Sequence, residues 1–127
     1  MSAPRHPGFH PGRRAAHGTT QHIYVMLAAM AGYLYFMSNR KDGPLYTGVT
    51  ADIGKRVYEH KEGVGSAFCR RYGLTRCVYF ETFDRIDDAI AREKTVKKWR
   101  RQWKVDLIET VNPDWADLNL TQLAPKL

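Results

Sequence analysis

The stretch "YLYFMSNRKDGPLYTG", residues Tyr33 to Gly48, decides the fold of this chain. Two short apolar runs, 33–37 and 45–49, are rich in the aromatic and branched residues that favour strands. The segment between them contains Asn, Asp, Gly and Pro, which are the usual residues of turns. This order predicts a β-hairpin at the start of the folded part of the chain.

The register of the hairpin brings two tyrosines together. If Ser38 lies opposite Gly43, then Tyr35 lies directly opposite Tyr46 and both side chains share one face of the sheet. Such an aromatic pair also stabilises a sheet without any further role, and the pattern leaves both interpretations open. Gly48 follows on the same face, where the missing side chain leaves room for a phosphate backbone.

The pattern after the hairpin predicts helices packed on a small sheet. Thr50 or Asp52 caps a helix over 53–61, residues 66–73 form one short helical turn, and residues 76–83 form a third strand. A long helical region follows, with a break before its last piece. The resulting order, β-β-α-β-α-α, is an α+β fold with a mixed or mainly antiparallel sheet.

The composition predicts one compact domain with a polyanionic partner. A length of 127 residues and an apolar fraction of 43% are sufficient for one core without crosslinks. Cys69 and Cys77 lack the spacing of a metal site, so we expect reduced packing residues. The net charge of +7 favours a nucleic acid or, alternatively, an anionic membrane surface.

Three parts of the chain differ in composition. Residues 1–31 are expected to form a flexible basic arm and linker, because they are rich in Pro, Gly, His and Arg and end in a short apolar run. That run is shorter than the ~20 residues of a membrane span, and a cleaved signal peptide is its alternative interpretation. Residues 32–120 form the folded domain and 121–127 a tail. We expect a cytoplasmic monomer without membrane contact.

Two polar residues of the first helix lie on its apolar side. Ile53, Arg56, Val57 and His60 recur at helical spacing, whereas Lys55 faces elsewhere. Either the Arg56 stem covers apolar surface and His60 is a hydrogen-bonded structural residue, or both serve a functional site.

The second helical region carries a carboxylate on its apolar side. Its expected N-cap is Asp84, it reaches at least Trp103, and its buried side is expected to include Ile86, Ala89, Ile90 and Val96. Glu93 lies on the same stripe. A buried carboxylate requires a cation. Arg56 would provide one in a structural ion pair, and Mg²⁺ or Mn²⁺ is the functional alternative.

Basic residues surround these positions. The run "KTVKKWRRQWK" at 94–104 indicates contacts with a phosphodiester backbone. The candidate nucleic-acid-binding residues are Lys55, Arg70, Arg71, Lys97, Lys98 and Arg101. Trp99 and Trp103 could stack on bases, but their spacing is more typical of a helix core.

The order and spacing of these motifs resemble the GIY-YIG nuclease domain, in particular small stand-alone bacterial members. "YLY" (Tyr33 to Tyr35) matches the first motif, with tyrosine at the usual glycine position, and "YTG" (Tyr46 to Gly48) matches the second, with threonine replacing isoleucine. The resemblance continues through "KRVYEHK" and "AIAREKTVKKWRRQWK" to about Leu120.

This resemblance implies a central three-stranded antiparallel sheet flanked by helices and a divalent-metal-dependent endonuclease acting on DNA. The implied catalytic residues are Tyr35, Tyr46, Arg56, His60 and Glu93. Arg56 would contact the scissile phosphate, and Glu93 would bind one Mg²⁺ or Mn²⁺ ion. Many members also use a late asparagine, for which Asn112 and Asn119 are the candidates.

The resemblance also implies how water is activated. Val49 stands where some members have a lysine, so Tyr46 with His60 is the expected activating pair, while Tyr35 holds the network and touches phosphate. The expected partner is DNA, cleaved with structural or weak specificity. Branched, nicked and damaged duplexes and RNA all stay open as substrates. The alternatives are a non-catalytic nucleic-acid-binding module, in which Arg56 and Glu93 form a structural ion pair, and a protein-interaction domain.

Overall fold

The computed structural model describes residues 30–120. The expected arm at 1–31 and tail at 121–127 lie outside the described residues, apart from Met30 and Ala31. The helices and strands in chain order are β1 (Gly32–Ser38), β2 (Tyr46–Thr50), α2 (Ile53–Lys61), α3 (Ala67–Tyr72), β3 (Arg76–Phe83), α4 (Ile86–Lys97) and α5 (Arg101–Val111).

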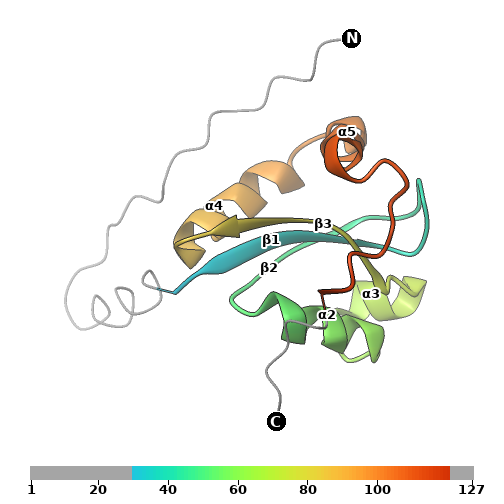
Figure 1. Ribbon diagram of the computed structural model, residues 1–127, viewed down its shortest axis with the longest axis horizontal. Helices are drawn as coiled ribbons and strands as arrows, with labels where there is room; N and C mark the ends of the chain where they lie inside the picture. The colour runs from blue at the N-terminus through green and yellow to red at the C-terminus, as the bar shows by residue number, and fades with distance from the viewer. Residues whose placement is uncertain (1–29, 121–127) are drawn as a thin grey trace, which may run out of the picture.

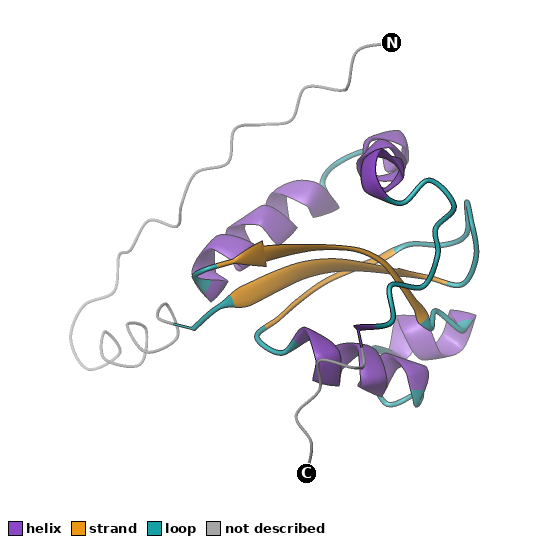
Figure 2. Cartoon of the chain, viewed as in Figure 1, coloured by secondary structure: helices purple, strands orange, loops and turns teal. Residues whose placement is uncertain are grey.

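The three strands form one antiparallel sheet in the order β2-β1-β3, so β1 is central and β2 is an edge strand. Helices α2 and α3 cover one face of the sheet, and α4 and α5 lie on the other (Figures 1 and 2). The expected α+β fold with a small antiparallel sheet flanked by helices is therefore confirmed.

Alternate residues of β1 enter two separate hydrophobic cores. The core on the α4–α5 side contains Leu34, Phe36, Val96, Trp99 and Ile108, and the core on the α2–α3 side contains Tyr35, Met37, Ile53, Val57, Cys69 and Cys77. Both faces of β1 are buried, which explains why its sequence is almost continuously apolar. The two cysteines are free and buried, as expected. Tyr35 thus lies on the α2 side of the sheet.

The register of the hairpin differs from the expected one. Tyr35 pairs with Gly48, and Tyr46 pairs with Met37, so the expected direct pairing of the two tyrosines is wrong by two residues. The loop is longer than assumed, since β1 ends at Ser38 and β2 begins only at Tyr46. Within it, Ser38 Oγ donates to the carbonyl oxygens of Arg40 and Pro44. A shift of two residues preserves the face of each side chain. Tyr35 and Tyr46 therefore remain diagonal neighbours, with ring centroids 6.2 Å apart.

Gly48 makes room for Tyr35 rather than for a phosphate. A Cβ atom at position 48 would lie 2.5 Å from the Tyr35 hydroxyl oxygen. We expect Gly48→Ala to lower the free energy of unfolding by roughly 1–3 kcal/mol through overpacking, as measured by urea denaturation. The same substitution in a Tyr35→Ala background should cost much less. An equal cost in both backgrounds would contradict this explanation.

The second helical region divides into two helices. Helix α4 ends at Lys97, and α5 begins at Arg101. The N-cap of α4 is Arg85 rather than the expected Asp84. Ile90, expected on the buried side, is 37% exposed. The buried stripe is set by Ala89 and Val96, and Ile90 is rotated by about 100° from Ala89.

Trp99 and Trp103 belong to the core, as their spacing favours. Trp99 is 5% exposed within the α4–α5 core, and Trp103 packs against the same core. Their rings meet edge to face, with centroids 5.9 Å apart. Within residues 30–120, no helix has the length and apolar character needed to cross a membrane.

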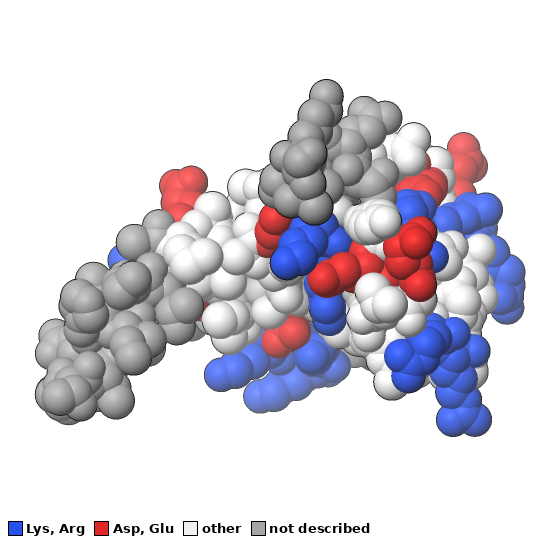
Figure 3. Space-filling model, turned by 90° about the horizontal axis from the view of Figure 1, so that it is seen from below, with Lys and Arg blue, Asp and Glu red and all other residues white. Residues whose placement is uncertain are grey.

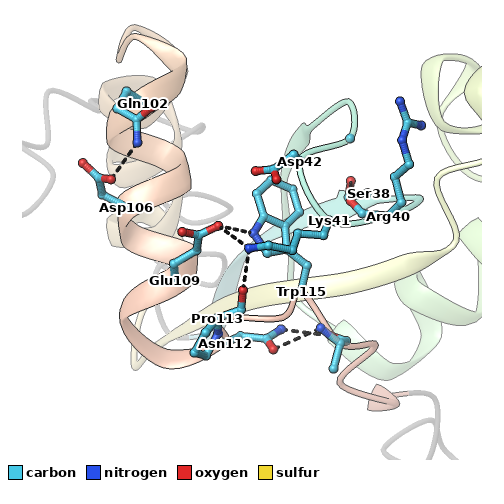
Figure 4. A network of polar contacts seen from close by, with 12 residues as sticks. Ser38, Arg40, Lys41, Asp42, Gln102, Asp106, Glu109, Asn112, Pro113 and Trp115 are labelled. Atoms are coloured by element: carbon cyan, nitrogen blue, oxygen red, sulfur yellow. Dashed lines mark hydrogen bonds and ion pairs between the residues drawn. The ribbon is translucent and has the colours of Figure 1, made fainter.

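The segment after α5 is held by a polar network (Figure 4). Trp115 is fully buried, and its Nε1–H donates to Glu109 at 2.8 Å. Lys41 Nζ, from the loop between β1 and β2, donates to the same carboxylate at 3.1 Å and to the Pro113 carbonyl at 2.9 Å. Leu118 N–H then bonds the carbonyl of Cys77 in β3. The C-terminal segment thus folds back onto the sheet, with Trp115 and Leu118 as its anchors.

Candidate active site

Helix α2 begins beside the end of β2 and places two polar side chains against the sheet. Asp52 caps the helix by accepting a hydrogen bond from the backbone N–H of Lys55. The helix then runs over 53–61, as the sequence predicts, with Val57 and His60 buried. Arg56 lies on the same side, and its side chain is 32% exposed.

The Tyr35 hydroxyl is the centre of this arrangement. Tyr35 has no exposed surface, and its hydroxyl oxygen lies 2.9 Å from His60 Nε2 and 3.3 Å from Arg56 Nε. The Arg56 N–H can only donate, so the tyrosine oxygen accepts there. If the Tyr35 hydroxyl donates its proton to His60 Nε2, the imidazole proton lies on Nδ1. This Nδ1–H is then the one group of the cluster without a hydrogen-bond partner within residues 30–120. The opposite tautomer, with Nε2–H donating to Tyr35, would leave two groups without a partner in the described part of the chain, namely the Tyr35 hydroxyl proton and the Nδ1 lone pair.

This environment fixes the charge states of the three groups. Burial, and then the charge of Arg56, lowers the pKa of His60 from 6.5 to about 4. Burial raises the pKa of Tyr35 above its ordinary value, and the hydrogen bond to Tyr35 raises the pKa of Arg56. At neutral pH the cluster therefore contains a neutral tyrosine, a neutral histidine and a charged guanidinium.

The lowered pKa of His60 predicts a pH dependence of stability. Below pH 6.5 the unfolded state binds a proton at His60, whereas the folded state does not until about pH 4. The unfolded state is therefore favoured as the pH falls through this interval. Between pH 7 and 4.5 we expect the wild type to lose roughly 2 kcal/mol more unfolding free energy than a non-titrating His60→Gln variant, as measured in urea. Parallel pH profiles for the two proteins would contradict the prediction.

Tyr46 contacts His60 through its ring. The Tyr46 and His60 rings meet edge to face with centroids 5.5 Å apart, while His60 Nε2 accepts its hydrogen bond from the Tyr35 hydroxyl. The expected pair of Tyr46 and His60 is therefore in ring contact, and the hydrogen bond of His60 is made with Tyr35. Since Tyr35 is fully buried, its expected contact with phosphate is not available in this structure. Tyr46 is only partly buried and is the accessible tyrosine of the two.

A pocket of about 330 Å³ opens beside Arg56. Its lining residues come from the end of β2, the β2–α2 turn and α2, and they are Val49, Thr50, Ala51, Asp52, Lys55, Arg56 and Glu59. We call it the α2 pocket. Glu59 pairs with Arg56 NH1 at 3.3 Å. Glu59 was not expected as a partner of Arg56, although residues three apart on a helix lie side by side and the sequence therefore contains the signal.

Glu93 lies on the buried stripe of α4, between Ala89 and Val96, with 16% of its side chain exposed. Its Oε2 atom pairs with Lys97 Nζ at 3.1 Å, whereas Arg56 pairs with Glu59. The expected structural ion pair between Arg56 and Glu93 is thus replaced by two pairs within single helices. The structure brings Tyr35, Tyr46, Arg56 and His60 together, and it places Glu93 on the helix across the sheet.

The described residues provide too few ligands to bind a metal ion without further ligands from water or substrate. Within residues 30–120, no three His, Cys, Asp or Glu side chains form a group that could hold a metal ion. Mg²⁺ is usually held by one or two carboxylates together with waters and substrate phosphates. The Glu93 carboxylate could be the protein ligand of such a site. In this structure its positive partner is the Lys97 ammonium group.

All six candidate nucleic-acid-binding residues are exposed. Figure 3 shows the α2–α3 side of the molecule, where Lys and Arg side chains lie along the lower margin and at the right-hand edge, and basic and acidic side chains are mixed near the centre. Lys55 lines the α2 pocket. Arg101 also has a structural role, because its guanidinium donates to the carbonyls of Asp42 and Gly43 at 3.0 and 2.7 Å.

The two candidate asparagines have different surroundings. Asn112 is buried, and its amide donates to the carbonyls of Val78 and Ala116 and accepts from the Ala116 N–H. Its hydrogen-bonding capacity is used inside the fold. Asn119 is exposed near the end of the described chain, with its N–H bonded to Asp117.

Comparison with known proteins identifies the family of this chain. The model of the GIY-YIG catalytic domain matches residues 31–106, which is more than half of the chain. The chain belongs to the GIY-YIG family. GIY-YIG nucleases act on DNA and generally use a divalent metal ion, and the match includes all five implied catalytic positions.

Several GIY-YIG relatives are similar over most of their own length. A UPF0213 protein of Staphylococcus saprophyticus is 40% identical over 76 residues, covering 60% of this chain and 92% of the relative. A UPF0213 protein of Clostridium perfringens is 38% identical over 78 residues, covering 61% of this chain and 83% of the relative. The solution NMR structure of the UPF0213 protein BH0048 from Bacillus halodurans is 31% identical, covers 76% of this chain and all of that chain, and has a TM-score of 0.45.

Proposed function

We propose that this GIY-YIG protein is an endonuclease that hydrolyses DNA phosphodiester bonds with Mg²⁺ or Mn²⁺. The observation that carries the proposal is the position of Arg56. Its Nε is anchored to a fully buried tyrosine hydroxyl, while the side chain lines an open pocket. A guanidinium held in this way is preorganised to bind a phosphate oxygen on which charge develops.

Tyr35 and His60 act as positioning residues in this proposal. Both side chains are buried, so they act on the substrate through Arg56 rather than by direct contact. Their hydrogen bond orients the Tyr35 oxygen toward Arg56. Tyr46, the accessible tyrosine beside them, orients the attacking water through its phenolic oxygen.

Glu93 is the proposed metal-binding residue. Its carboxylate, which pairs with Lys97 here, would hold a divalent cation together with phosphate oxygens of bound DNA. A bound divalent ion supplies Lewis-acid stabilisation of the phosphoryl charge and the leaving oxygen. A cytoplasmic location, where cellular DNA is accessible, is part of the same proposal.

A nicking assay tests the proposal. Supercoiled plasmid, linear duplex, branched and single-stranded DNA, and RNA are incubated with Mg²⁺, with Mn²⁺ or with EDTA. We expect metal-dependent cleavage of at least one DNA substrate that is abolished in EDTA. Salt-sensitive binding that Mg²⁺ does not affect, without cleavage of any substrate, would instead indicate a non-catalytic nucleic-acid-binding module.

A further inference from the structure

A second pocket lies at the opposite end of β2 from the α2 pocket. Its volume is about 320 Å³, and it is lined by Leu45, Tyr46, Thr47, Phe68, Lys97 and Lys104. We call it the Phe68 pocket. It lies where the edge strand β2 is flanked by α3 on one side and by α4 and α5 on the other. Its size is at the lower end of the range for small-ligand sites, about 300–1,000 Å³.

The cationic side of this pocket lacks a full counter-charge. Lys97, whose side chain is 52% exposed, pairs with Glu93. The pKa of Lys104 is lowered because burial, and then the charges of Arg101 and Lys97, disfavour its protonated form. A bound anion would relieve this repulsion, and a phosphate group matches two neighbouring ammonium groups.

The other side of the pocket is aromatic. Phe68 is 43% exposed, and its ring stacks on that of Tyr46 with centroids 6.4 Å apart and planes inclined by 27°. Tyr72, which is 45% exposed, lies 4.9 Å from Phe68 between ring centroids. Exposed aromatic rings beside cationic side chains are typical of surfaces that bind unpaired bases, because every base has a face that can stack.

We infer that the Phe68 pocket is a subsite for one nucleotide that flanks the scissile phosphate, with its base stacked on Phe68 and its phosphate between Lys97 and Lys104. The inference rests on the proposed function and assigns a nucleotide contact that Arg56 and Glu93 do not make.

Tyr46 connects the subsite to the candidate active site. Its ring lines the Phe68 pocket and also contacts Tyr35 and His60. Strand β2, whose residues line both pockets, is on the order of 13 Å long, a distance that a strand of a few nucleotides covers. A single polynucleotide strand following the free edge of β2 would therefore reach both pockets.

Binding in EDTA tests the subsite independently of cleavage. The probe is a labelled single-stranded oligodeoxynucleotide, together with a series in which one position at a time is abasic, measured by fluorescence anisotropy. We expect one or two abasic positions to weaken binding to the wild type about tenfold. In Phe68→Leu the intact probe should bind about tenfold more weakly, and those abasic positions should have no further effect.

Two variants control for general effects. Tyr58→Leu removes another exposed aromatic ring, from α2 and outside both pockets, and should change binding less than twofold. Phe68→Tyr retains the ring and should bind as the wild type does. Lys104→Gln should make the slope of log K against log salt concentration less steep by about one, as expected for the loss of one phosphate contact.

The outcomes separate this inference from the proposed nuclease function. Equal effects of all abasic positions, or unchanged binding by Phe68→Leu, would overturn the subsite even if the wild type cleaves DNA. Loss of the position-specific effect in Phe68→Leu would support the subsite even if no substrate were cleaved.

Discussion

Replacing Arg56 by alanine is expected to lower the rate of DNA nicking about a thousandfold, because the anchored guanidinium is the group best placed to stabilise developing phosphoryl charge. Arg56→Lys should recover little of this loss. A lysine keeps the positive charge but cannot donate an Nε–H to the Tyr35 oxygen while presenting a planar fork to phosphate. Single-turnover nicking of a plasmid with saturating Mg²⁺ measures both effects.

The fold should survive the Arg56 substitutions. The Tyr35 hydroxyl keeps its hydrogen bond to His60, so the lost bond from Arg56 should cost roughly 1 kcal/mol of unfolding free energy. Arg40→Ala provides the charge-matched control, since Arg40 is exposed in the β1–β2 loop and its guanidinium bonds the neighbouring Asn39. A nicking rate of Arg56→Ala within tenfold of the wild-type rate would contradict the proposal that Arg56 stabilises the phosphoryl charge.

Glu93→Gln is expected to lower metal-dependent nicking by about a hundredfold or more, because an amide keeps the shape of the side chain but loses the charge that holds a divalent cation. DNA binding in EDTA should be unchanged or tighter, since a negative charge is removed beside Lys97. The measurement is the nicking rate as a function of Mn²⁺ and Mg²⁺ concentration, combined with binding in EDTA.

Glu62→Gln is the matched control for Glu93. Glu62 is an exposed carboxylate at the C-cap of α2 that lines neither pocket. Its substitution should leave the metal dependence of nicking unchanged. A Glu93→Gln protein with wild-type rates at every metal concentration would remove Glu93 from the metal site and leave Arg56 as the supported part of the proposal.

Local patterns were sufficient for the strand and helix order and for the bounds of α2. Helical spacing also placed Arg56 and His60 on the apolar side of α2, and it placed Glu93 on the buried stripe of α4. Spacing of this kind reports which side of a helix a residue occupies, because the periodicity of a helix is independent of its partner. It does not report what the residue contacts across the fold.

The contacts of the site residues depended on tertiary packing. The alternation of apolar and polar residues could not predict the two-residue difference in hairpin register, because a shift of two residues keeps every side chain on the same face of the sheet. That register placed Gly48, rather than Tyr46, opposite Tyr35 and so allowed the tyrosine ring to lie over the glycine. The Phe68 pocket was missed for a related reason, since it joins Phe68 of α3 to Lys104 of α5 across the edge of β2.

The sequence by itself determined that this chain is a small α+β domain with a basic surface, and that two tyrosines, an arginine, a histidine and a glutamate lie on nominally apolar faces. Only the tertiary structure decided that Tyr35 bonds His60 and Arg56, that Glu93 pairs with Lys97, and that burial lowers the pKa of His60. The physical reason is that hydrogen-bond partners and pKa values depend on burial and on distances between segments far apart in the chain.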